Sequence, residues 1–87
     1  MTGRKRHRLE IIVAILDYCA QKRRRPTRIM YKANLSWVPL QWFLKLLTGK
    51  GLLEETDPHF FMTTDAGREY LQRTRAITTI LGGEDED

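Results

Sequence analysis

Residues 34–45 read N-L-S-W-V-P-L-Q-W-F-L-K, and this stretch contains the signals that decide the fold. Asn34 tolerates the left-handed backbone conformation that a tight turn between two helices requires. Ser36 is a favoured residue at a helix start, and Pro39 falls in the first turn, where its missing N–H removes no hydrogen bond. Four apolar residues then follow at the spacing of one helical face: Leu40, Phe43, Leu44 and Leu47. The stretch predicts an interhelical turn and a helix over residues 36–49.

Two helices are predicted before this turn. Residues 7–21 carry apolar side chains at helical spacing, namely Leu9, Ile12, Val13, Leu16 and Cys19 or Ala20. Pro26 disfavours helix at Arg25, and a shorter helix begins at P-T (26–27), where we expect Thr27 to cap the first turn. The short helix directs Ile29, Met30 and Ala33 inward. A short helix, a three-residue turn and a capped helix make a helix-turn-helix.

A β-hairpin and a last helix are predicted after residue 51. The runs 52–56 and 60–64 are β-capable and flank an Asp-Pro turn, so they indicate a hairpin. Thr64 caps a helix over 65–81, which places Ala66, Tyr70, Thr74, Ile77 and Leu81 on one face. Residues 82–87, G-G-E-D-E-D, are expected to be a disordered acidic tail. The predicted fold class is mainly α (α+β), a winged helix-turn-helix in a single domain over 1–81 that begins with a basic arm, residues 1–7.

Charge is distributed unevenly along the chain of 87 residues, whose net charge is +4. Residues 1–50 hold 12 Lys and Arg against two acids, a net charge of +10, whereas residues 51–87 hold three against nine, a net charge of −6. This separation indicates a polyanionic partner for the basic half and favours nucleic acid. A solvated basic face is the alternative interpretation.

Several classes of function are disfavoured by the composition. The sequence has no run of 18 apolar residues, and its polar N-terminus does not resemble a signal peptide, so we expect a cytoplasmic protein with no membrane contact. Cys19 is the one cysteine and is expected to be a small buried hydrophobe rather than a redox thiol. There is no Cys/His metal spacing, nucleophile motif or glycine-rich phosphate loop. We therefore expect no enzyme, no metal site and no cofactor.

Three strings resemble the archaeal winged-helix DNA-binding family. They are T-R-I-M-Y-K-A-N-L-S (27–36), G-L-L-E-E (51–55) and T-T-D-A-G-R-E-Y-L (63–71), and the resemblance covers roughly residues 8–75. The family includes small chromatin proteins of thermoacidophiles and presumed transcription regulators. The resemblance implies a winged-helix fold, a nucleoid-associated double-stranded DNA-binding function and a homodimer joined through the C-terminal helix. The dimer candidates on that helix are Tyr70, Ile77, Ile80 and Leu81.

The candidate DNA contacts form two sets. The second helix of a helix-turn-helix enters the major groove, which gives the base-reading candidates Trp37, Val38, Gln41, Trp42 and Lys45. Gln41 can pair with adenine, and Lys45 can reach guanine or phosphate. The basic residues before and within the first helix of the motif would hold phosphates, which gives the candidates Arg24, Arg25, Arg28 and Lys32. Thr27 and Ser36, at the starts of the two helices, are further phosphate candidates. Arg4, Lys5, Arg6 and Arg8 are candidates for contact with the backbone or the minor groove.

An apolar front on the predicted recognition helix leaves other partners open. The family commonly has Lys or other polar residues where this chain has Val38, Pro39 and Trp42. An exposed Trp is typical of protein interfaces, so the domain could be a protein–protein interaction module, for example in a transcription complex. A third interpretation is RNA or single-stranded DNA, whose bases could stack on Trp37, Trp42 and Tyr31.

Overall fold

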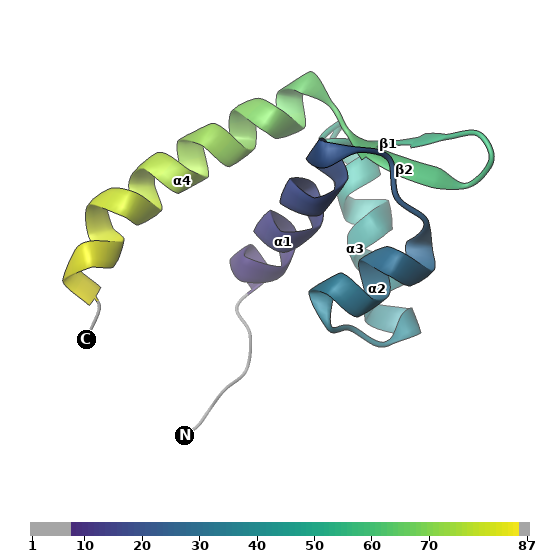
Figure 1. Ribbon diagram of the computed structural model, residues 1–87, viewed down its shortest axis with the longest axis horizontal. Helices are drawn as coiled ribbons and strands as arrows, with labels where there is room; N and C mark the ends of the chain where they lie inside the picture. Colours follow the sequence, from purple (N-terminus) through teal and green to yellow (C-terminus); the bar gives the residue numbers. More distant parts are fainter. Residues whose placement is uncertain (1–7, 86–87) are drawn as a thin grey trace.

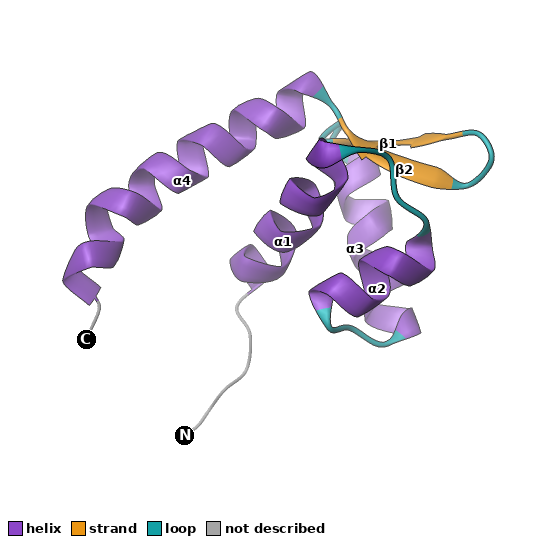
Figure 2. Cartoon of the chain, viewed as in Figure 1, coloured by secondary structure: helices purple, strands orange, loops and turns teal. Residues whose placement is uncertain are grey.

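Four helices and one hairpin follow one another in the computed structural model, which describes the backbone of residues 8–85 and the side chains of residues 8–77. The elements are α1 (Arg8–Gln21), α2 (Pro26–Ala33), α3 (Trp37–Gly49), β1 (Leu53–Thr56), β2 (Phe60–Thr63) and α4 (Asp65–Asp85). Figure 2 shows the hairpin projecting from the helical body as a wing. The predicted winged helix-turn-helix order is confirmed.

The turn between α2 and α3 forms as the sequence predicts. Asn34 adopts the left-handed conformation with φ 57° and ψ 49°, and its N–H donates to the Tyr31 carbonyl at 3.2 Å. Ser36 is the N-cap of α3, where its carbonyl accepts the Leu40 N–H at 3.1 Å, although its hydroxyl makes no capping bond. The four predicted inward residues of α3 are all buried, which confirms the apolar stripe.

The expected cap of α2 by Thr27 is wrong. Arg25 is the N-cap, Pro26 is the first helical residue, and the Arg25 carbonyl accepts the Ile29 N–H at 3.1 Å. Pro26 suits this first position because its ring fixes a helical φ and its missing N–H would have no partner there. The helix therefore begins before Thr27, which lies exposed in the first turn.

The buried face of α1 is rotated from the predicted one. Ile11, Ile15, Leu16 and Cys19 are buried, whereas Leu9 is 46% exposed and Ile12 and Val13 are half-buried. The helix contacts α2, α4 and β2, so its apolar surface is shared among three neighbours. The spacing of apolar residues predicts the helix, but the neighbouring elements determine which of its side chains are buried.

The hairpin gains a third chain segment that the sequence pattern does not reveal. Strands β1 and β2 pair antiparallel, from Leu53 opposite Thr63 to Thr56 opposite Phe60. Arg24 adds a bridge on the β2 side, since its N–H donates to the Phe61 carbonyl at 2.9 Å and its carbonyl accepts the Phe61 N–H at 2.8 Å. The loop between α1 and α2 is thereby fastened to the wing.

Helix α4 begins as predicted, because the Gly67 N–H donates to the Thr64 hydroxyl at 3.0 Å. Its inward residues differ from the prediction: Gly67 and Leu71 are buried, whereas Ala66 is exposed. Figure 1 shows α4 starting near the C-terminal end of α1 and diverging from it.

The last helix also runs farther than the predicted end at residue 81. Helix α4 reaches Asp85, so residues 82–85 are helical where a disordered tail was expected, and residues 86–87 lie outside the described range. Once a helix is established, each further residue adds one hydrogen bond, so two glycines at about 1 kcal/mol each do not have to end it.

Candidate nucleic-acid interface

A groove lies between α2, α3 and the wing, with a volume of about 780 Å³. We call it the recognition groove. Its residues from α3 are Trp37, Gln41, Leu44, Lys45 and Thr48, and those from the start of α2 include Arg25 and Thr27. The wing contributes Glu55, Pro58 and His59. Three of the five base-reading candidates and two phosphate candidates therefore come together in one concave surface.

Val38 and Trp42, the other two base-reading candidates, lie outside this groove. Val38 is 75% exposed, one position along the helix from Trp37. The Trp42 ring lies 5.0 Å from the Arg8 guanidinium carbon and meets the Phe43 ring edge-on at 4.9 Å between centroids. Trp42 therefore faces the start of α1. The arm residues Arg4, Lys5 and Arg6 lie outside the described residues.

A second concavity, of about 390 Å³, lies between the end of α1, the start of α2 and β2. We call it the cationic pocket. Its lining residues are Tyr18, Lys22, Arg23, Arg24, Arg25, Arg28 and Phe60. The set contains five cations and no carboxylate.

The side chain of Arg24 makes its contacts within the domain. Its guanidinium carbon lies 3.7 Å from the centroid of the Tyr18 ring. Its Nε–H donates to the Tyr18 carbonyl at 2.9 Å, and its Nη2 group donates to the Gln21 side chain at 2.8 Å. The side chain predicted to contact phosphate therefore holds the loop against the end of α1.

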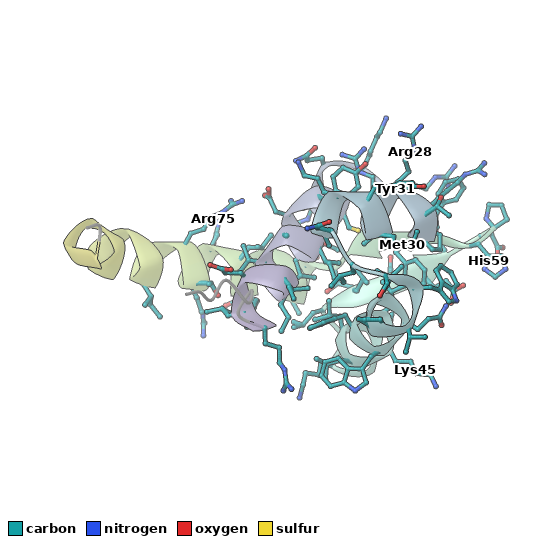
Figure 3. The ribbon with its side chains drawn as sticks, turned by 90° about the horizontal axis from the view of Figure 1, so that it is seen from below. Arg28, Met30, Tyr31, Lys45, His59 and Arg75 are labelled. Carbon is teal, nitrogen blue, oxygen red and sulfur yellow. The ribbon has the colours of Figure 1, made fainter. Side chains whose placement is uncertain are left out.

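The remaining phosphate candidates divide between two faces. Figure 3 shows Arg28 and Lys45 pointing to opposite sides of the body. Lys32 lies on the α1 side of α2, with its Nζ 5.7 Å from the centroid of the Tyr18 ring. Ser36 is exposed and does not line the groove. Arg25 lines both concavities and joins them.

The wing brings negative charge to the rim of the recognition groove. Glu54, Glu55 and Asp57 are exposed, and His59 Nδ1 lies 3.1 Å from Glu55 Oε2. The other ion pairs of the described residues are Arg73–Glu69 and Arg75–Asp17. Within that part of the chain, no Lys or Arg side chain of the groove or the pocket forms an ion pair with a carboxylate. The positive charge of both surfaces is thus available to an anionic partner.

Cys19 is buried in the core at the end of α1. Burial raises the pKa of its thiol from 9.0 to about 12, and the nearby positive charge of Arg24 opposes this shift in part. The thiol is neutral at physiological pH, and its predicted identity as a small buried hydrophobe is confirmed. Residues 8–77 contain no cluster of three His, Cys, Asp or Glu side chains suited to a metal. None of the described helices has the length and apolar character needed to cross a membrane.

The dimer candidates on α4 are described only in part. Tyr70 is half-buried and packs against the core, whereas Ile77 is 58% exposed. The side chains of Ile80 and Leu81 lie outside the described residues. Among the described side chains of α4, Ile77 is therefore the large hydrophobic residue that the domain leaves exposed.

A helix-turn-helix followed by a hairpin, with a groove along its second helix, defines the winged-helix class of DNA-binding domains. A sequence model described as winged helix-turn-helix matches residues 5–81, and the chain belongs to that family. Members of the family are typically DNA-binding domains without enzymatic activity. No curated protein matches the chain.

Proposed function

We propose that this protein binds double-stranded DNA with α3 in the major groove, and that it acts as an archaeal transcription regulator or a chromatin-type protein of the cytoplasmic nucleoid. One observation carries the proposal: Trp37, Gln41, Lys45 and Thr48 line a concave surface beside the start of α2. An α-helix fits the major groove, where its side chains reach base edges. None of the α3 residues in this surface is acidic, so the helix presents no charge that repels DNA.

Each element of the groove has a part in this proposal. The amide of Gln41 suits adenine, and the Lys45 ammonium suits guanine or a phosphate. Arg25 and Thr27 at the start of α2 suit the sugar-phosphate backbone, because the positive end of the helix dipole attracts anions there. Two polar base readers provide little sequence selectivity, which favours binding controlled mainly by phosphate contacts.

Duplex binding at two salt concentrations tests this function. We expect the affinity for a short duplex to fall several-fold or more between ~50 and ~200 mM salt, because bound cations release counterions from DNA. A selection on random duplexes then separates the two roles: an enriched motif supports a regulator, and tight binding without a motif supports a chromatin-type protein. Absence of duplex binding at the lower salt concentration would contradict the proposal.

A homodimer is proposed alongside DNA binding. Ile77 exposes more than half of its side chain on α4, and Ile80 and Leu81 follow it at helical spacing in the sequence. Apolar residues repeated along one helical face suit pairing with the same face of a second copy.

A protein–protein interaction module is the second candidate function. Val38 is 75% exposed beside Pro39 and the half-exposed Trp42 ring, so α3 presents an apolar edge outside the recognition groove. A protein of a transcription complex would suit this edge. Trp42→Ala separates the candidates: unchanged duplex affinity together with loss of a captured protein partner would favour the interaction module.

A further inference from the structure

Several positively charged side chains converge in the cationic pocket, around the aromatic ring of Phe60. The Arg23 and Arg25 guanidinium carbons lie 4.6 and 5.2 Å from the centroid of the Phe60 ring. Lys22 and Arg28 are exposed at its edge and have no carboxylate partner among the described residues. Cations of like charge repel one another, so their convergence without an acid suits an anionic ligand.

The aromatic contacts orient these arginines. A guanidinium that stacks on an aromatic ring uses its flat face and leaves its N–H edge free to donate hydrogen bonds. The cation–π contacts with Phe60 therefore hold Arg23 and Arg25 over the ring, while their N–H donors remain able to bind a phosphate oxygen. Paired donors of this type recognise phosphate groups by two parallel hydrogen bonds.

The pocket lies on a different face from the recognition groove. Arg28 belongs to the pocket and Lys45 to the groove, and Figure 3 shows that they point to opposite sides of the body. Arg25 is the residue that the two surfaces share. A duplex seated along α3 would leave the exposed cations of the opposite face without a partner.

We infer that the cationic pocket is a second nucleic-acid site, which binds the phosphate backbone of another DNA segment. One molecule then holds two segments, one at α3 and one at the pocket. The inference rests on the proposed function because the first segment binds at the recognition groove. The second site binds phosphates, since five of its seven lining residues are cations, which suit the sugar-phosphate backbone.

Capture of a second duplex on DNA-coated beads tests this inference. The beads carry one duplex, the protein is bound at low salt, and a labelled second duplex is then added. The full-length wild-type protein should capture the second duplex. Arg23→Gln with Arg28→Gln should still bind the beads through the groove but capture several-fold less, and its slope of log affinity against log salt should become less steep. Phe60→Leu retains every charge and should also reduce capture, because it removes the surface that orients the arginines.

The controls distinguish this inference from the proposed function. Arg73→Gln with Arg75→Gln removes the same charge from α4 and should capture as the wild type does. Lys45→Glu should weaken attachment to the beads, and a failure to do so counts against the groove rather than the pocket. Undiminished capture by the pocket variant, as expected if a dimer bridges DNA through its two grooves, would overturn the inference. Wild-type protein that binds the beads but captures nothing would overturn it equally.

Discussion

At some single positions of this domain, the residue type alone predicts the local backbone structure. Asn34 and Thr64 are predicted from residue type alone, and both occupy the expected turn and cap. Thr27 fails as a cap because Pro26 competes for the helix start. Arg24 gives no advance signal of its structural role, because its partners Tyr18 and Phe61 are contributed by two other elements. Local chemistry is therefore visible in the sequence, and tertiary contacts are not.

Gly67 should not tolerate a side chain. A Cβ atom at this position would lie 2.2 Å from the Leu52 carbonyl oxygen and 2.5 Å from Thr63 Cγ2. We expect Gly67→Ala to lower the free energy of unfolding by about 1–3 kcal/mol, because backbone must move to remove the overlap. Gly49→Ala is the matched control, since no atom lies within 4 Å of its added Cβ. Urea denaturation compares them, and equal stability of the two variants would refute the packing argument.

The Cys19 thiol should resist modification in the folded protein. Its pKa of about 12 in the native state keeps the thiolate scarce, and the side chain is buried. We expect the rate of alkylation at pH 8 to rise by orders of magnitude on addition of denaturant. Rapid alkylation of the native protein would show that the thiol is accessible.

Linkage gives a second consequence of the raised pKa of Cys19. The unfolded thiol ionises near pH 9 and the folded one only near pH 12. The contribution of Cys19 to the free energy of unfolding is therefore complete below pH 9, and it is lost as the pH rises toward 12. Denaturant titrations of wild type and Cys19→Ala between pH 8 and 10.5 should show a steeper loss of stability in the wild type.

Elements are predicted well where one face must be buried. The α3 stripe and the hairpin follow from apolar spacing and turn residues, and both form as predicted. The buried face of α1 is missed because three neighbours share that helix. The division of the basic residues between groove and pocket also could not be predicted, since it depends on how α2 packs beside α1 and α3. Of the predicted base readers, Trp37, Gln41 and Lys45 come together, whereas Trp42 turns toward Arg8.

The turn between α2 and α3 should depend on the left-handed backbone of Asn34. Its φ of 57° is unfavourable for most residues but accessible to Asn and Gly. We expect Asn34→Ala to destabilise the domain by about 1 kcal/mol and Asn34→Gly to change stability by less than about 0.5 kcal/mol. Thermal unfolding of the two variants beside the wild type measures the difference. Similar losses in both would show that the Asn side chain matters more than its backbone.

The whole molecule separates its charges and leaves the end of α4 extended. Positive charge is concentrated in residues 1–50, and the acidic wing and C-terminal residues supply most of the negative charge. A polyanion therefore approaches the helix-turn-helix side with a directional attraction. The far part of α4 diverges from the body (Figure 1), which makes it available for pairing with another copy.

Ile77→Asp tests the proposed dimer. A charge on this exposed apolar position should weaken an isologous contact, because each copy contributes the same residue. Sedimentation equilibrium should show a dimer for the wild type and a shift to monomer for the variant. Gln72→Asp is the control, because Gln72 is an exposed position of the same helix. Thr74 is half-buried, so Thr74→Asp would be unsuitable. A monomeric wild type at micromolar concentration would contradict the dimer.

We propose above all that α3 binds duplex DNA through the recognition groove. The most direct test is the duplex affinity of Lys45→Glu relative to Arg73→Glu, measured by fluorescence anisotropy at low salt. The two variants change net charge equally, but Lys45 lines the groove, whereas Arg73 lies on α4 and pairs with Glu69. We predict that Lys45→Glu lowers the affinity at least tenfold and that Arg73→Glu lowers it no more than about threefold, as expected for long-range charge alone. Equal losses in the two variants would contradict binding through α3.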